Sequence, residues 1–185
     1  EAFDFVIVSL IQQYWVPNLG LPPIESASTI LTVRTSAPAE TFWVPLRELS
    51  GDIPFNYDFM INWGDGTPDS HVTAHDDAAV VHEYASPGDY DVTLTGLLEG
   101  LYFKNNSTAA SFQLINVKAF GQTGWTSGQG MFWNCELCVF SAGPTCDTSA
   151  VKSMEGMFLN CGAATSIDVS EFNTSAVVST GPGDG

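Results

Sequence analysis

The chain has 185 residues, of which 44% are apolar and 14% charged, so it is long enough to bury one core or two small ones. Its 21 acidic residues outnumber 5 lysines and arginines and give a formal net charge of −16. Such a charge repels phosphate backbones and anionic lipid surfaces, which argues against nucleic-acid binding. The longest apolar run, residues 5–11, is far shorter than the roughly 20 residues of a membrane-spanning helix.

Several features favour an extracellular protein, located at the cell surface or released from it. The chain opens at Glu1 and no basic segment precedes the first apolar run, so we expect a mature or trimmed product. Four cysteines, few lysines and three N-x-[ST] sequons are typical of an oxidising compartment. We therefore expect a glycoprotein, modified at Asn105, Asn106 and Asn173.

Residues 1–25 differ from the rest of the chain and are expected to form an N-terminal strand arm followed by a spacer. The first 16 residues are rich in valine, isoleucine and aromatic residues, and the next nine contain three prolines. The strand is apolar on both faces, which is typical of strands buried within a sheet. The apolar residues of this assembly strand are Phe3, Phe5, Val6, Ile7, Val8 and Leu10. We expect it either to pair with its own domain or to add to the sheet of a neighbouring copy.

From Thr29 onward, short runs of β-forming residues alternate with turn clusters, which predicts an all-β fold with a sandwich over residues 26–112. The expected strands fall within residues 28–35, 41–46, 55–63, 80–85, 89–96 and 112–120. The turn clusters between them include residues 49–54, 64–69 and 86–89. No apolar stripe with the period of a helix interrupts this pattern.

Residues 113–185 contain an internal repeat. The sequence GMFWNC at 130–135 recurs as GMFLNC at 156–161, and DTSAV at 147–151 recurs as NTSAV at 173–177, both at an offset of 26 residues. A period of this size indicates a solenoid whose rungs stack to share a core. We expect glycines 130 and 156 to permit close approach of the rungs, and the following side chains to point inward: Met131, Phe132, Met157 and Phe158.

Two segments carry a resemblance to a known family. INWGDGT at residues 61–67 and HEYASPGDYDVTL at residues 82–94 resemble the signature of PKD-type β-sandwich domains. Together with the GMFxNC repeats, they resemble bacterial or other microbial surface proteins with BspA-like leucine-rich repeats, over about residues 28–180. The resemblance implies a PKD/Ig-like sandwich followed by a short leucine-rich-repeat-like solenoid, and an adhesive or structural role.

Two metal-site hypotheses stand beside a purely structural interpretation of the acidic and histidine residues. Four aspartates have the hard oxygen ligands that calcium prefers, although no D-x-D-x-D-G loop is present: Asp65, Asp69, Asp76 and Asp77. The three histidines, His71, His75 and His82, lie within twelve residues of one another beside two of these acids and suggest a transition metal. We expect instead a solvated loop with a structural His82, and no cofactor; calcium is the alternative.

The four cysteines, Cys135, Cys138, Cys146 and Cys161, allow a zinc site or two disulfides. The first two form a C-x-x-C pair, but the others lie 15 residues apart, so we favour disulfides. Cys135 and Cys161 occupy the same repeat position, and stacked rungs would bring their Cα atoms into disulfide range. Cys138 and Cys146 would then close the loop between them, although the sequence leaves three pairings open.

The sequence contains no nucleophile elbow, phosphate-binding glycine loop or H-E-x-x-H helix, so we do not expect an enzyme. The first functional hypothesis is a structural subunit of a surface filament, a head-to-tail homopolymer assembled by strand addition from residues 1–16. The alternative is a monomeric adhesin module that binds a host surface protein or a glycan. An exposed aromatic patch at Trp125 or Trp133 would favour this alternative.

Overall fold

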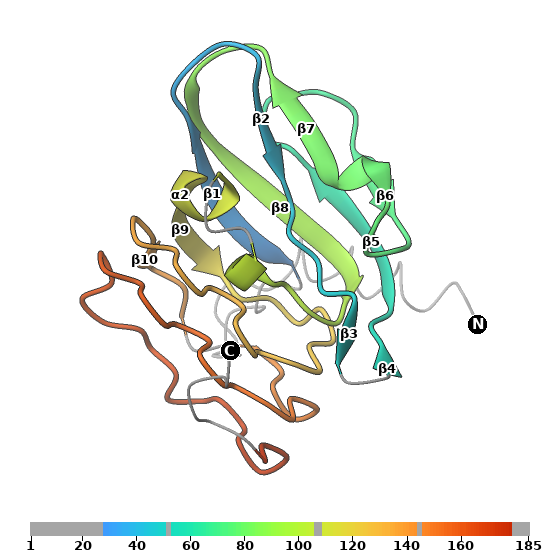
Figure 1. The fold of residues 1–185 in the computed structure, drawn as a ribbon, viewed down its shortest axis with the longest axis vertical. Coiled ribbons are helices and arrows are strands. Elements are labelled where there is room, and N and C mark those ends of the chain that lie inside the picture. The colour runs from blue at the N-terminus through green and yellow to red at the C-terminus, as the bar shows by residue number, and fades with distance from the viewer. Residues whose placement is uncertain (1–27, 51–52, 106–108, 144–145, 179–185) are drawn as a thin grey trace, which may run out of the picture.

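The computed structural model describes residues 28–50, 53–105, 109–143 and 146–178 (Figure 1). The N-terminal strand arm lies outside these residues. The described elements are β1 (Thr29–Thr35), β2 (Glu40–Trp43), β3 (Leu49–Ser50), β4 (Ile53–Pro54), β5 (Tyr57–Asn62), β6 (Ser70–Val72), η1 (Ala78–Val80), β7 (Val81–Tyr84), β8 (Gly88–Leu98), η2 (Phe103–Asn105), α2 (Ala110–Gln113), β9 (Leu114–Ala119) and β10 (Val139–Phe140). The fold is all-β in class, as predicted.

A six-stranded sheet with the order β10-β9-β1-β8-β5-β6 forms the larger layer. The eleven-residue strand β8 lies at its centre and pairs antiparallel with β1 on one side and β5 on the other. Burial alternates along β5: Tyr57, Phe59 and Ile61 are buried, while the residues between them, including the apolar Met60, are exposed. This alternation determines which face of the sheet covers the core.

Strands β2 and β7 form a second, two-stranded sheet, which lies in front of β1, β8 and β5 in Figure 1. The two strands are antiparallel, with Phe42 opposite His82. Phe42 and Tyr84 are fully buried from this side, and Leu31, Val33 and Leu94 are fully buried from the larger sheet. The interface between the two sheets is therefore the core of the sandwich. Burial of each such side chain stabilises the fold by about 1.5–3 kcal/mol before the entropy of ordering is subtracted.

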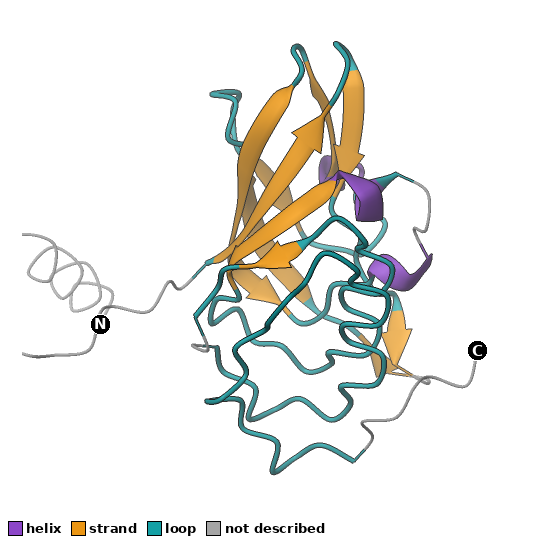
Figure 2. Cartoon of the chain, turned by 90° about the vertical axis from the view of Figure 1, so that its left-hand side faces the viewer, coloured by secondary structure: helices purple, strands orange, loops and turns teal. Residues whose placement is uncertain are grey.

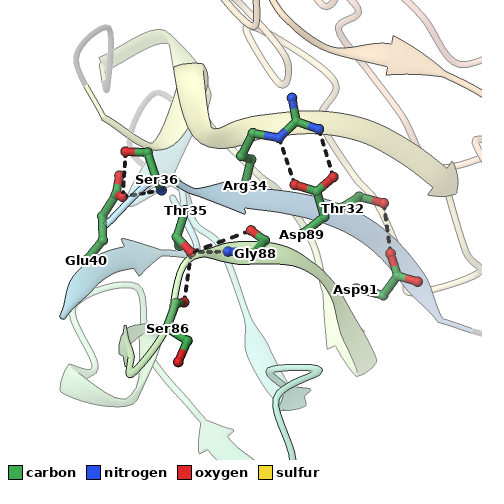
Figure 3. Close-up of polar contacts among 9 residues, drawn as sticks. All are labelled: Thr32, Arg34, Thr35, Ser36, Glu40, Ser86, Gly88, Asp89 and Asp91. Carbon is green, nitrogen blue, oxygen red and sulfur yellow. Dashed lines mark hydrogen bonds and ion pairs between the residues drawn. The ribbon is translucent and has the colours of Figure 1, made fainter. Parts of the chain in front are cut away.

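Polar side chains hold the β1–β2 connection to the beginning of β8 (Figure 3). The Arg34 guanidinium donates from Nε and Nη2 to both oxygens of Asp89, each at 2.7 Å. The Glu40 carboxylate accepts from the backbone N–H of Ser36 at 2.6 Å and from its hydroxyl at 3.0 Å. The Thr35 hydroxyl accepts from the Gly88 N–H at 3.1 Å. The Arg34 and Glu40 contacts are exposed and add little to stability, whereas the part-buried Thr35–Gly88 contact links β1 to β8.

After β9 the chain winds through stacked loops, defined here as residues 121–178, which form the lower half of Figure 2. Backbone N–H groups of one loop donate to carbonyls of the next, from Gly130 to Glu155 at 2.9 Å and from Phe132 to Met157 at 2.8 Å. The Asn160 side chain donates to the Asn134 side chain, 26 residues earlier, at 2.8 Å. The repeat period of the sequence is therefore also the period of this stacking.

The repeated glycine and the apolar residues after it behave as the repeat predicted. Gly156 has a φ of +59°, and a Cβ on it would lie 2.6 Å from the Trp133 ring, so the close approach of the loops requires glycine. Met131 and Phe132 are fully buried, Met157 is buried, and Phe158 packs partly buried against the same core. These side chains are part of the scaffold.

One continuous apolar core joins the sandwich to the stacked loops. Phe120 directly follows β9, and its ring lies 5.9 Å from Trp125, 6.3 Å from Phe132 and 5.5 Å from Phe172. Strand β9 is hydrogen-bonded to β1 of the sandwich and to β10 of the loops. The two parts of the chain consequently share both a sheet and a core.

Two local features differ from the expectations. The predicted strand at 112–120 begins only at Leu114, because residues 110–113 form the helical turn α2. The expected repeat segment 113–185 also includes β9, which the structure places in the sandwich sheet. The physical reason is that β9 has a strand partner on each side, β1 and β10, and a β-propensity pattern does not specify which partner a strand takes.

Candidate functional site

A line of stacked rings runs from the NWGDGT turn into the sandwich. The rings of Trp63 and His82 are stacked at 4.8 Å, His82 meets Tyr84 edge-on at 4.6 Å, and Tyr84 stacks on Tyr90 at 4.2 Å. The Tyr84 hydroxyl donates to the Trp63 carbonyl at 3.0 Å, and both residues are almost fully buried. His82 is therefore a structural residue here, as predicted.

Asp65 connects this turn to β7. One carboxylate oxygen accepts from the Thr67 hydroxyl at 2.6 Å and from the Thr67 N–H at 3.1 Å, and the other lies 2.8 Å from His82 Nε2. Because an ionised carboxylate only accepts, Nε2 donates. Burial of the Asp65 carboxyl raises its pKa, but the hydrogen bonds from Thr67 and His82 outweigh this and lower the pKa to about 2.

This low pKa predicts an acid-sensitive contribution to stability. In the unfolded chain an aspartate pKa is about 3.9, so ionised Asp65 stabilises the folded state by about 2 kcal/mol above that pH. The contribution is lost as the pH falls from about 4 toward about 2. In Asp65→Asn the amide oxygen still accepts from Thr67 but does not titrate, so urea denaturation between pH 2 and 5 should show a flatter pH dependence. Equal slopes for wild type and Asp65→Asn would contradict the prediction.

The four aspartates of the calcium hypothesis have separate roles. Asp69 accepts from the Asn62 side chain at 2.7 Å, Asp77 accepts from the N–H groups of Thr73 and Ala79, and Asp76 is exposed. Over the described ranges, the structure contains no group of three or more histidine, cysteine, aspartate or glutamate residues that could hold a metal ion. The acids therefore act in turns, where their oxygens accept from backbone and side-chain donors.

The other two histidines are each placed beside a single acid. His71 Nε2 lies 2.7 Å from Asp58 across the β5–β6 pair, and His75 Nδ1 lies 3.9 Å from Asp76. Together with the Asp65 contact of His82, this distributes the histidines over three different partners. The grouping of histidines that the sequence suggested is not formed.

Neither expected disulfide pair is bridged in this structure. Cys135 and Cys138 are buried; burial raises the pKa of the Cys135 thiol, and the neighbouring Cys138 and Cys161 raise it further. The Cys161 thiol donates to the Phe132 carbonyl at 3.2 Å, and the Cys138 thiol to the Val139 carbonyl at 3.2 Å. Pairing of these cysteines under oxidising conditions stays a prediction.

Of the three expected glycosylation sites, Asn106 lies outside the described residues, and Asn105 is described in its backbone alone, as the last residue of η2. Asn173 is exposed, and its side-chain oxygen accepts from the Ser175 N–H at 3.0 Å in a turn between stacked loops. An exposed turn is a position that a bulky glycan can occupy.

The tryptophans proposed as an aromatic binding patch are not freely exposed. Trp125 is 1% exposed and packs against Phe120. Trp133 is half-buried, with Gly156 against its ring and the Lys104 ammonium 4.4 Å from the ring centroid. An aromatic platform on the stacked loops therefore finds no support.

The described sheets end in edge strands, and β7 is the edge of the smaller sheet. Strand β7 has β2 on one side and no strand on the other among the described residues. The carbonyls of Val80 and Tyr84 accept from the N–H groups of Val44 and Ala39, beyond the two ends of β2. Since backbone groups alternate in direction along an antiparallel strand, those of Val81 and Glu83 point away from β2. The Val81 side chain is 53% exposed at this edge.

A pocket of ≈ 540 Å³ lies between the β4–β5 connection and the stacked loops. Residues at equivalent repeat positions form its wall in pairs, Ser127 with Ser153 and Ala150 with Ala176, and Lys152 lies beside them. The sequence does not reveal this site, because the residues facing the repeats, among them Phe55 and Glu99, are distant in the chain. The repeated serine was the available signal.

Comparisons with known proteins leave the family open. No family model matches the chain, and neither a curated protein nor a solved structure is significantly similar to it. In the described ranges, none of the helices has the length and apolar character of a membrane-spanning segment.

Proposed function

We propose that this protein is a structural subunit of an extracellular surface filament, in which residues 1–16 of one copy add as a strand to the sheet of the next copy. The observation that carries the proposal is that β7, in a two-stranded sheet that covers a six-stranded one, has no strand on its outer side within residues 28–178 as far as these are described. The arm, apolar on both faces, is the kind of strand that such an edge accepts. The proposal includes the finer fold assignment, a PKD-like sandwich followed by BspA-like repeats, supported by the NWGDGT turn and the 26-residue stacking.

Backbone geometry supports β7 as the acceptor. The Val81 N–H already donates to the Ala78 carbonyl, so the Glu83 N–H and the carbonyls of Val81 and Glu83 remain for an incoming strand. The opposite edge of the same sheet is partly covered, because the Gln113 side chain donates to the Thr41 carbonyl at 3.1 Å. The exposed Glu83 disfavours direct pairing of two β7 edges, since like charges would then approach each other.

Two changes test strand addition from its two sides. Deletion of residues 1–16 removes the donor strand, and Glu83→Pro removes the outward N–H of the acceptor edge without removing a bond to β2. Negative-stain microscopy and sedimentation should show filaments for the wild type and folded monomers for both variants. Circular dichroism establishes that each variant is folded.

Thr41→Pro is the matched control, because Thr41 faces Glu83 in the register and its N–H points to the opposite edge. It should still form filaments. Particulate wild-type protein, or filaments that persist after the deletion, would contradict the proposed function. Filaments formed by Glu83→Pro but not by the deletion variant would move the acceptor to another edge.

The second candidate function is a monomeric surface adhesin that binds a protein or a glycan. The observation that favours it is the pocket between the sandwich and the stacked loops, whose wall contains several hydroxyl groups. This candidate predicts a particulate wild-type protein with a ligand in that pocket.

A further inference from the structure

We infer that the pocket between the β4–β5 connection and the stacked loops binds an acidic saccharide, a sugar unit that carries a carboxylate. Its volume of ≈ 540 Å³ lies within the range of small-molecule sites, about 300–1,000 Å³. One wall is built from two successive loops and the other from Pro54, Phe55 and Asn56, so the site depends on both parts of the fold.

Hydroxyl groups of the pocket have hydrogens available for a ligand. The Ser127 Oγ accepts from the Gln129 N–H at 3.2 Å, and the Ser153 Oγ accepts from the Glu155 N–H at 3.4 Å. Each hydroxyl has one donor hydrogen and two lone pairs, so both serines can still donate. Ser127 is only 4% exposed, which makes an unused donor costly and a polyhydroxylated ligand favourable.

Lys152 provides the positive charge for a carboxylate. In the part of the chain that the structure describes, Arg34 and Lys118 are paired with aspartates, and the cations of Arg47 and Lys104 lie over aromatic rings. Lys152 is exposed at the pocket and has no such carboxylate or ring partner among these residues. In a chain with a net charge of −16, this ammonium is an isolated attractive point for an anion.

Glu99 determines which anion fits. Its Oε2 accepts from the Asn56 N–H at 2.8 Å and from the Asn56 side chain at 3.1 Å, which leaves Oε1 to accept from a ligand hydroxyl. Glu99 and Lys152 both line the pocket but form no ion pair with each other. A negative charge opposite the lysine disfavours phosphate, whereas a sugar acid can direct its carboxylate to Lys152 and a hydroxyl to Glu99.

Phe55 adds an apolar surface to these polar groups. Its ring packs on Gly100, where a Cβ would lie 3.0 Å from the ring, and the Arg47 guanidinium carbon is 5.7 Å from the ring centroid. The half-buried ring is thereby held in place at the pocket. The C–H groups of a sugar ring can pack on such a surface, whereas a small amino acid such as glycine has no apolar face to pack there.

This inference rests on the ligand binding proposed for the second candidate function and specifies its ligand, and that binding can occur whether or not the protein also forms filaments. The full-length protein is titrated with glucuronate, and binding is followed by ligand-observed NMR. Glucose is the neutral comparison, and glycine and inorganic phosphate are competitors. We expect glucuronate to bind about tenfold more tightly than glucose, the effect of one charge-assisted hydrogen bond.

Lys152→Gln should reduce glucuronate binding to the level of glucose and leave glucose unchanged. Lys118→Gln is the matched control, because Lys118 is paired with Asp91 away from the pocket and should bind glucuronate as the wild type does. No signal with glucuronate, equal effects of the two substitutions, or displacement by phosphate or glycine would overturn the inference. Filament formation, measured on the same Lys152→Gln sample, tests the first function separately.

Discussion

Phe132→Ala should lower the free energy of unfolding by about 3–5 kcal/mol, the cost of removing a fully buried aromatic ring from a core. Phe132 is 0% exposed and lies where the stacked loops meet the sandwich. Its ring centroid lies 5.3–6.3 Å from four others, those of Phe103, Phe120, Phe140 and Phe158. Because these rings come from both parts of the chain, the cavity should destabilise both.

Hydrogen exchange followed by mass spectrometry distinguishes a shared core from two independent ones. In Phe132→Ala, amides of β8 and amides of residues 126–134 should lose protection together. Phe112→Ala is the control, because that ring is 40% exposed, and it should cost less than about 1 kcal/mol. Loss of protection confined to the stacked loops would contradict a shared core.

Gly64→Ala should destabilise the sandwich by about 2–4 kcal/mol, far more than the same change at Gly66. The two glycines flank Asp65 and have similar positive φ angles, +79° and +83°. A Cβ on Gly64 would lie 2.6 Å from the Asp91 carbonyl oxygen in β8, whereas a Cβ on Gly66 would meet no atom within 4 Å. The pair therefore separates the cost of crowding from the cost of the backbone conformation.

Urea denaturation of both variants measures this difference. Gly66→Ala should cost about 1–2 kcal/mol, from the left-handed conformation alone. Gly143→Ala is a further control, because it has neither a positive φ nor a neighbour within 4 Å and should change stability little. Equal destabilisation by Gly64→Ala and Gly66→Ala would contradict the prediction, because it would mean that β8 moves enough to accommodate the added methyl group.

Local patterns in the sequence predicted much of the architecture. The run of β-forming residues at 55–63 predicted the strand that the structure shows as β5, Tyr57–Asn62. The cluster at residues 64–69 predicted the turn in which Gly64 and Gly66 have positive φ angles, and the 26-residue offset predicted the stacking that brings Asn134 beside Asn160. These features depend on residues that are close in the chain or that repeat at a fixed interval, so they can be predicted from the sequence alone.

The candidate sites were less predictable. Asp76 and Asp77 are adjacent in the sequence, yet one is exposed and the other caps the turn before β7. Lys152 and Glu99 carried no recognisable motif, and only the packing of the loops beneath the sandwich brings both to one pocket. The sequence shows which side chains could bind a ligand, but it does not show which of these side chains point toward the same site.

The sequence by itself determined the all-β class, the main strands, the turn at Gly64 and the repeat period, because each follows from backbone preference or from a motif that recurs at a fixed interval. The tertiary structure alone decided that β9 joins the sandwich sheet to the loops, that β7 is an edge strand among the described residues, and that a pocket forms at the junction. These outcomes depend on contacts between distant residues such as Phe120 and Phe172. Their free energy comes from apolar surface that is buried only when the two parts of the fold meet.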